Sequence, residues 1–105
     1  MDFKQVEPAV KQYLDRIKKN LPVEGVILFG SFAKGKAEED SDIDLIILSR
    51  KFSKMGDDER LKLLYRLSVG FPYNLHAYGL TQKEFDYASP LTTLGEAKKT
   101  GIRIA

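Results

Sequence analysis

The chain reads GSFAKGKAEEDSDID from Gly30 to Asp44, between the apolar runs VILF at residues 26–29 and LIIL at residues 45–48. Both runs are continuously apolar, which is typical of strands buried on both faces of a sheet. Because side chains alternate along a strand, Asp42 and Asp44 are expected on one face, about 6.5 Å apart. The stretch therefore predicts a turn and a loop that lead into two carboxylates at the start of a buried strand.

The two aspartates predict a site for a cation. On its own, Asp42 is explained as a turn or strand-entry residue. Asp44 is not explained in this way, because an aspartate between Ile43 and Leu45 is disfavoured in a strand and costly to bury without a partner. Two like charges at this spacing also repel each other unless positive charge lies nearby. We therefore predict that Asp42 and Asp44 bind a divalent metal ion.

The loop that begins at Gly30 predicts a phosphate-binding turn. A tight turn at Gly30 and Ser31, followed by a short helix over residues 32–34 that ends at Gly35, would direct backbone N–H groups and the Ser31 hydroxyl toward a triphosphate. The missing side chain of Gly30 would let the backbone approach the phosphates closely. Lys34 is expected either to contact phosphate or to remain in solvent.

The same loop has the spacing of a P-loop, but its chemistry does not fit that motif. Gly30, Gly35 and Lys36 match, whereas Ala37 stands where a Ser or Thr hydroxyl must reach Mg²⁺. Three acidic residues at positions 38–40 follow, where a P-loop directs a helix N-terminus at the phosphates. We expect these acidic residues to lie in a solvated loop.

Composition and charge narrow the class of protein. The chain has 105 residues, of which 43% are hydrophobic and 30% charged, and this suits a single domain over residues 1–105. It has no cysteine, which excludes disulfides and thiolate metal sites. A formal charge of +2 does not require nucleic acid as a partner, and no apolar run has the length of a membrane span or a signal peptide. We therefore expect a cytoplasmic protein without a membrane partner.

Apolar periodicity predicts helices and strands in alternation. The first segment has apolar residues at helical spacing and ends at residues 20–22. The other predicted elements are strands at residues 25–29, 43–48 and 73–78, and helices from residue 57 to about residue 69, at 82–87 and from 89–90 onward. This order predicts an α/β fold in which helices pack on a small mixed sheet.

The Gly-Ser turn, the spacer of about ten residues and the Asp-x-Asp pair between two apolar strands resemble a known signature. It is that of the nucleotidyltransferase superfamily with the DNA polymerase β palm fold, and in particular of the minimal nucleotidyltransferases. The matching residues are Gly30, Ser31, Gly35, Ser41, Asp42, Asp44 and Leu45. The resemblance extends over nearly the whole chain and implies an α+β nucleotidyltransferase fold. It also implies that the matching glycines and serines, with Lys34, bind the nucleotide and its phosphates.

The resemblance further implies two-metal catalysis. In this family two divalent ions, usually Mg²⁺, are held by the Asp-x-Asp pair and by a third carboxylate on a later strand. Asp42 and Asp44 match the pair, as catalytic residues and metal ligands. The residue that matches the third position is Asn74, an amide that can bind Mg²⁺ but cannot accept a proton as a carboxylate can. His76, two residues later on the same strand face, is a further candidate base or ligand.

Two functions are compatible with this resemblance. The first is Mg²⁺-dependent transfer of a nucleoside monophosphate from an NTP, expected to be ATP, to an acceptor hydroxyl, with release of pyrophosphate. A helical partner protein of the HEPN type would then carry the acceptor, as in a toxin–antitoxin pair. The second is a non-catalytic nucleotide-binding or antitoxin subunit, in which Asn74 has ended turnover.

Overall fold

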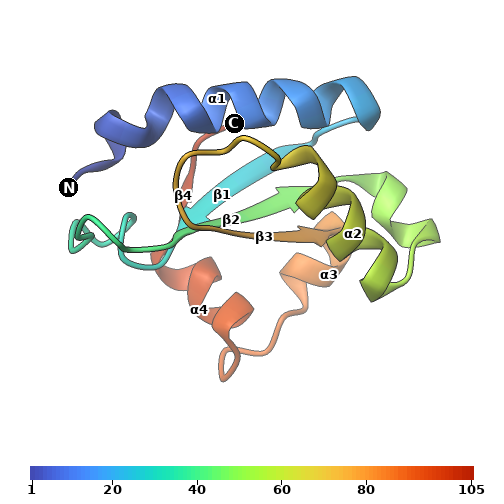
Figure 1. Ribbon diagram of the computed structural model, residues 1–105. Coiled ribbons are helices and arrows are strands. Elements are labelled where there is room, and N and C mark those ends of the chain that lie inside the picture. Colours follow the sequence, from blue (N-terminus) through green and yellow to red (C-terminus); the bar gives the residue numbers. More distant parts are fainter.

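The two apolar runs form the centre of a four-stranded mixed sheet in the computed structural model, which describes residues 1–105 (Figure 1). The strands lie in the order β3-β2-β1-β4; β1 is antiparallel to β2 and β4, and β2 is parallel to β3. Their bounds are Gly25–Phe29 for β1, Ile43–Leu48 for β2, Leu75–Leu80 for β3 and Ile102–Arg103 for β4. Every residue of β1 and β2 except Asp44 is buried, which confirms the prediction that both central strands are covered on both faces.

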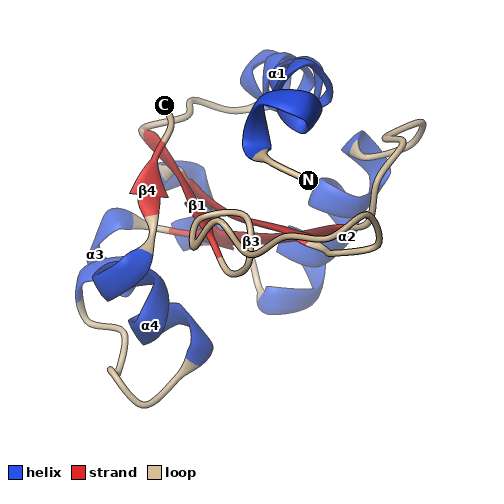
Figure 2. Ribbon diagram, turned by 90° about the vertical axis from the view of Figure 1, so that its left-hand side faces the viewer, coloured by secondary structure: helices blue, strands red, loops and turns tan.

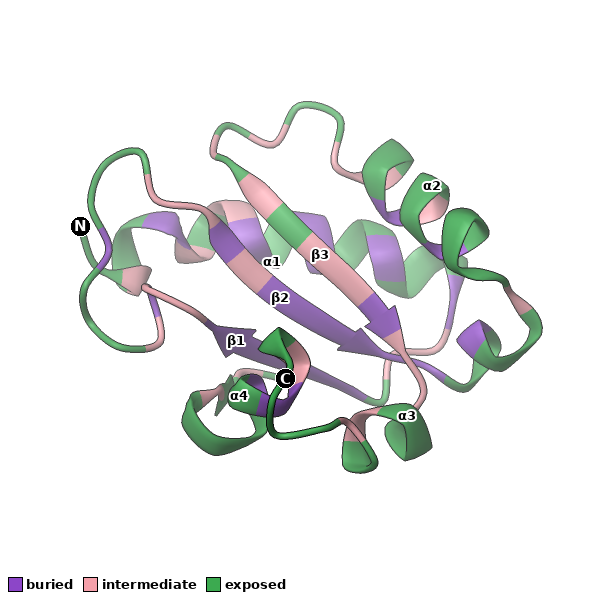
Figure 3. Cartoon of the chain, turned by 90° about the horizontal axis from the view of Figure 1, so that it is seen from below, coloured by how far each residue is buried: buried purple, intermediate pink, exposed green.

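Helices cover the two faces of the sheet (Figure 2). α1 (Phe3–Asn20) and α2 (Asp57–Leu67) join the odd-numbered residues of β2 in the larger apolar core. α3 (Gln82–Asp86) and α4 (Thr93–Thr100) lie against the opposite face, where a smaller apolar cluster forms. The even-numbered residues of β2, Asp44 among them, point to this second face, on which β3 is only partly buried (Figure 3). None of the helices has both the length and the apolar character that crossing a membrane requires.

Most of the predicted elements are confirmed, but two begin elsewhere. The third strand begins at Leu75 instead of residue 73, because its parallel partner β2 begins at Ile43, level with Leu75. The last helix begins at Thr93 instead of residues 89–90. Its N-cap is Thr92, whose hydroxyl accepts a hydrogen bond from the Gly95 N–H at 3.1 Å. Ser-Pro at 89–90 lies in the turn that precedes this cap.

Two further differences concern short elements. The prediction of a short helix over residues 32–34 is wrong, because residues 30–35 form a series of turns. The 3₁₀ helix η1 (Arg50–Lys54) and strand β4 were not expected from the sequence. β4 has two exposed residues, so it carries no alternating apolar pattern that could reveal it.

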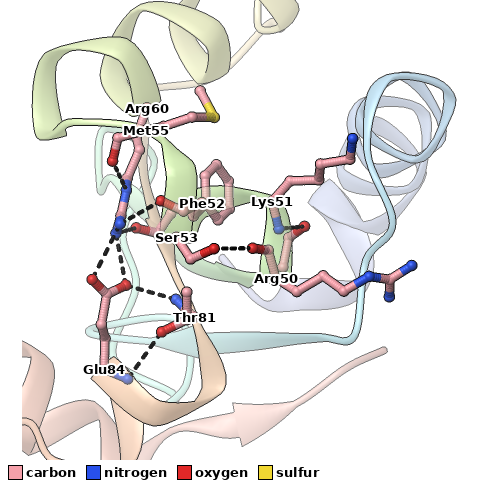
Figure 4. A network of polar contacts seen from close by, with 10 residues as sticks. Arg50, Lys51, Phe52, Ser53, Met55, Arg60, Thr81 and Glu84 are labelled. Carbon is pink, nitrogen blue, oxygen red and sulfur yellow. Dashed lines mark hydrogen bonds and ion pairs between the residues drawn. The ribbon is translucent and has the colours of Figure 1, made fainter.

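Arg60 links four elements at one end of the sheet (Figure 4). Its buried guanidinium donates hydrogen bonds to the carbonyl oxygens of Met55, Phe52 and Gly79. It also donates to both carboxylate oxygens of Glu84, at 2.7 and 3.1 Å. These contacts join η1, α2, β3 and α3, and they fix the position at which the chain leaves β3.

Replacing Glu84 with Gln is expected to lower the free energy of unfolding by about 1 kcal/mol at pH 7. The value is at the low end for a hydrogen bond to a charged group, because the Glu84 side chain is 43% exposed. The hydrogen bonds from Arg60 lower the pKa of Glu84 below its ordinary value, with a smaller contribution from Thr81. A lowered pKa in the folded state means that this stabilisation is complete above the unfolded-state pKa, about 4.3, and is lost as the pH falls through the folded-state pKa.

Urea unfolding of the wild type and of Glu84→Gln, from pH 7 into the acid range, measures this difference. Glu24→Gln is the matched control, because it removes an exposed pair with Arg50 at 3.6 Å and is expected to change stability little. Equal losses in the two variants would contradict the prediction. So would a difference for Glu84→Gln that does not shrink in acid.

Candidate active site

Three side chains from three strands lie in a row across the second face of the sheet. The antiparallel register places Phe29 level with Asp44, and the parallel register places Asp44 level with His76. The Nδ1 atom of His76 lies 3.4 Å from Asp44 Oδ1 and 3.7 Å from Asp42 Oδ2. Both aspartate side chains therefore lie near the same imidazole, which agrees with the expectation that they share one face of the strand.

Gly30 brings the turn after β1 directly against this row. Its φ of 74° lies in the left-handed region that favours glycine. A Cβ atom built on Gly30 would lie 2.2 Å from Asp44 Oδ2, closer than any real contact allows. The sequence predicted that the missing side chain admits a phosphate. In the structure the missing side chain makes room for the Asp44 carboxylate.

The rest of the turn is held by its own backbone. The Lys34 N–H donates to the Gly30 carbonyl at 3.2 Å, and the Lys36 N–H donates to the Ser31 carbonyl at 2.9 Å. Gly35 has a φ of 70°, and a Cβ atom built there would meet no neighbouring atom. Glycine is therefore favoured at this position by its backbone conformation and not by a lack of space. The result is a compact turn with an exposed rim, from which the Lys34 side chain extends.

A cavity of about 290 Å³ opens between the strand row, this turn and α4. It is lined by Phe29, Gly30, Lys34, Asp44, His76, Tyr78, Thr93 and Glu96. The rings of Phe29 and Tyr78 lie 6.0 Å apart and make one wall aromatic. The remaining walls carry one lysine, two carboxylates and the imidazole. Such a mixed lining suits a ligand with both a planar apolar part and a charged part.

Burial gives Asp44 an unusual electrostatic environment. Loss of solvation raises the pKa of Asp44 above its ordinary value; the nearby His76 opposes this shift, and the charge of Asp42 adds to it. The Asp44 side chain is 19% exposed and that of Asp42 is 44% exposed. The ionised form of Asp44 is therefore short of compensating positive charge, and a bound cation would supply it.

The donor atoms at this site fit Mg²⁺. Mg²⁺ prefers oxygen ligands and is commonly held by one or two carboxylates together with substrate phosphates. Asp44 provides a carboxylate inside the cavity, beside the turn at Gly30, and Asp42, which does not line the cavity, provides a second carboxylate near the same imidazole. No group of three or more His, Cys, Asp or Glu side chains is arranged to hold a metal ion without further ligands. The residues present therefore fit a metal ion that arrives with a phosphate-bearing ligand.

Two of the predicted residues, Ser41 and Asn74, make hydrogen bonds within the loops next to the site. The Ser41 hydroxyl accepts a hydrogen bond from the Glu38 N–H at 2.8 Å and closes a turn of the acidic loop. The Asn74 side chain is exposed and donates to the Asp40 carbonyl at 3.2 Å. Neither residue lines the cavity. On β3, His76 is the residue that lies against the two aspartates.

Four lining residues were not among the predicted site residues: Phe29, Tyr78, Thr93 and Glu96. Thr93 and Glu96 lie on α4. Glu96 Oε1 lies 2.8 Å from Lys34 Nζ, and this interaction lowers the pKa of Glu96. The contact joins residues that are 62 positions apart, so no local sequence pattern predicts it. The available signal was the N-cap at Thr92, which would have placed the start of α4 correctly.

Comparisons with known proteins agree with this fold. A model of the nucleotidyltransferase domain family matches residues 10–99. The chain is 33% identical over 82 residues to “Putative protein adenylyltransferase MJ1305” of Methanocaldococcus jannaschii, covering 76% of this chain and 53% of that protein. It is 28% identical over 94 residues to “Putative protein adenylyltransferase MJ0604” of the same organism, covering 88% and 94%. The chain thus spans about half the length of the first of these relatives and nearly all of the second.

Two solved structures share the architecture. One is described as a “putative nucleotidyltransferase” from Sulfolobus solfataricus; it has a TM-score of 0.72 and 21% identity, and the match covers 94% of this chain and 78% of that one. The other is a toxin–antitoxin structure with AMP-PNP; it has a TM-score of 0.65 and 19% identity, and the match covers 89% and 69%. At these identities the likeness is one of fold.

Proposed function

Because the chain belongs to the nucleotidyltransferase domain family, we propose that it transfers a nucleoside monophosphate from a nucleoside triphosphate to a hydroxyl group of a partner protein. The observation that carries the proposal is the Asp44 carboxylate, which lies against the Gly30 turn in a cavity that Lys34 also lines. The Asp42 carboxylate lies near the same imidazole as Asp44. ATP is the proposed nucleotide and a protein the proposed acceptor, because the similar proteins bear the name protein adenylyltransferase.

The residues would divide the work as follows. Asp42 and Asp44 would hold Mg²⁺ together with phosphate oxygens of the nucleotide. When bound, one or two Mg²⁺ ions neutralise charge on the triphosphate and lower the pKa of the attacking hydroxyl. Lys34 and the N–H groups of the turn at Gly30 would bind the phosphates. His76, against both carboxylates, would hold them in position.

The proposed partner is a helical protein of the HEPN type, which carries the acceptor hydroxyl. A structural neighbour is described as a toxin–antitoxin assembly, and this supports a paired protein. An apolar hollow of about 180 Å³ between α2 and β3 adjoins the candidate site and shares His76 and Tyr78 with it. Leu61 and Tyr65 line this hollow and are largely exposed. A partner seated there would reach the site without crossing the sheet.

Label transfer tests this function. The chain is incubated with Mg²⁺ and ATP labelled at the α-phosphate, alone and with a HEPN-type partner. The expected result is label on the partner and release of pyrophosphate, both abolished by a chelator. ATP labelled at the γ-phosphate is the control and should leave the partner unlabelled, since that phosphate departs with pyrophosphate.

A second candidate function is favoured by the contacts of Asn74, which is no carboxylate and lies outside the cavity. On this reading the chain binds nucleotide as an antitoxin subunit without turning it over. Intact binding of ATP, with no label transferred from any nucleotide to any tested partner, would favour this reading and overturn the enzymatic one.

A further inference from the structure

The ion pair between Lys34 and Glu96 closes across the candidate site. The two residues line the same cavity as Asp44 and His76, and the pair joins the turn after β1 to the first turns of α4. The Lys34 and Glu96 side chains are 40% and 57% exposed. An ion pair with this exposure contributes little to stability, because solvent screens both charges. A phosphate group can therefore replace Glu96 as the partner of Lys34 at little cost.

The backbone that carries Glu96 is firmly held. Ala97, the next residue, is buried against β1 in the smaller apolar cluster. Gly95, the preceding residue, packs so closely that a Cβ atom there would lie 1.7 Å from the Ser89 carbonyl oxygen. The backbone of α4 therefore holds Glu96 in a fixed position beside the cavity. The Glu96 side chain can still rotate away from Lys34 and contact another group.

The cavity has one carboxylate that the sheet does not provide. Asp44 and Glu96 are the only acidic residues that line it, and the acidic loop at residues 38–40 does not reach it. We propose that Glu96 accepts the proton of the acceptor hydroxyl, after Lys34 has exchanged Glu96 for a phosphate of the nucleotide. This inference rests on the proposed function and assigns to α4 the carboxylate that Asn74 cannot supply.

The step balances as a displacement at the α-phosphorus of the nucleotide. The oxygen of the acceptor hydroxyl forms a bond to this phosphorus, and its proton passes to the Glu96 carboxylate. The bond from the α-phosphorus to the bridging oxygen breaks, and pyrophosphate leaves with the electron pair. The proton on Glu96 is then lost to solvent, which is accessible because the side chain is half exposed.

The opposite wall of the cavity does not offer an equivalent group. His76 has its Nδ1 atom within 3.7 Å of both aspartates, so it belongs to the carboxylate cluster. Glu96 is not part of any group of three potential metal ligands. It faces the cavity from α4, whereas Asp44 faces it from β2, so a substrate between them has a carboxylate on each side.

Glu96→Gln tests the inference, with Glu24→Gln as the matched control that removes one partner of an exposed ion pair elsewhere. The assay follows AMP and pyrophosphate formed from Mg²⁺-ATP with water as the acceptor, and label transfer to the HEPN-type partner. Glu96→Gln is expected to lower kcat about 10²-fold. It is also expected to bind ATP several-fold more tightly, because Lys34 is released. Glu96→Asp should recover part of the lost rate, and Glu24→Gln should match the wild type.

Several outcomes would overturn the inference. A kcat for Glu96→Gln within about threefold of the wild type would exclude a proton-accepting role. Weaker ATP binding together with a lower melting temperature would indicate that Glu96 only supports the fold. If the wild type forms neither AMP nor labelled partner, the proposed function fails, and the proton-accepting role of Glu96 fails with it. ATP binding can still be measured in that case. Equal ATP affinity in the wild type and Glu96→Gln would then show that Lys34 does not leave Glu96 to bind a phosphate of the nucleotide.

Discussion

Replacing Asp44 with Asn is expected to lower the rate of nucleotidyl transfer by about 10³-fold. The Asp44 carboxylate lines the cavity and lies against His76 and the Gly30 turn. An amide in its place keeps the shape but removes the charge. Metal-assisted charge stabilisation of this kind is worth several kcal/mol, and each 1.36 kcal/mol corresponds to about tenfold in rate. Initial rates of label transfer at saturating Mg²⁺-ATP measure the loss.

The same substitution is expected to raise the free energy of unfolding at pH 7, measured in the presence of a chelator. Burial raises the pKa of Asp44 in the folded protein. An acid with a raised folded-state pKa stabilises the fold below its unfolded-state pKa and loses this contribution as the pH rises through the folded-state pKa. At pH 7 the charge is therefore a net cost, and Asn removes it. The gain in stability should disappear in acid, where Asp44 is protonated.

Asp40→Asn is the matched control for both measurements. It removes the same charge four positions away, from an exposed residue outside the cavity. We expect its transfer rate and its stability to stay close to those of the wild type. A similar loss of rate in Asp40→Asn and Asp44→Asn would show that overall charge, and not the position of Asp44, governs the reaction.

Replacing Gly30 with Ala is expected to lower the transfer rate about 10²-fold and to destabilise the fold by about 2–3 kcal/mol. The left-handed backbone alone costs about 1–2 kcal/mol for a residue with a Cβ. The new Cβ would also meet Asp44 Oδ2, so the carboxylate must move. A displacement of about 1 Å in a catalytic group is enough for a rate loss of this size.

Gly35→Ala separates the cost of backbone strain from the cost of the contact with Asp44. Gly35 has nearly the same φ as Gly30, but a Cβ there meets no atom within 4 Å. We expect about 1–2 kcal/mol of destabilisation from backbone strain and little change in rate. In an Asp44→Ala background, the stability cost of Gly30→Ala should fall to that of Gly35→Ala. A cost that is the same with and without the Asp44 side chain would contradict the contact.

The central part of the fold could be predicted from the sequence because its signals are local. The two strands around the turn at Gly30 are apolar on both faces, and strand periodicity places Asp42 and Asp44 together without any knowledge of their neighbours. The first two long helices follow from apolar spacing in the same way. The boundaries of the later elements could not be predicted as well. The start of β3 depends on where its partner begins, and the start of α4 depends on a cap and on the close packing of Gly95.

The sequence by itself therefore determined the turn, the carboxylate pair and the fold family, since these depend on residues that are near one another in the chain. Only the tertiary structure decided which groups surround the pair. Parallel pairing of β2 and β3 places His76 beside Asp44, and the packing of α4 on β1 brings Glu96 to Lys34. These neighbours are set by strand register and helix packing between distant segments, and periodicity within one segment contains no information about them.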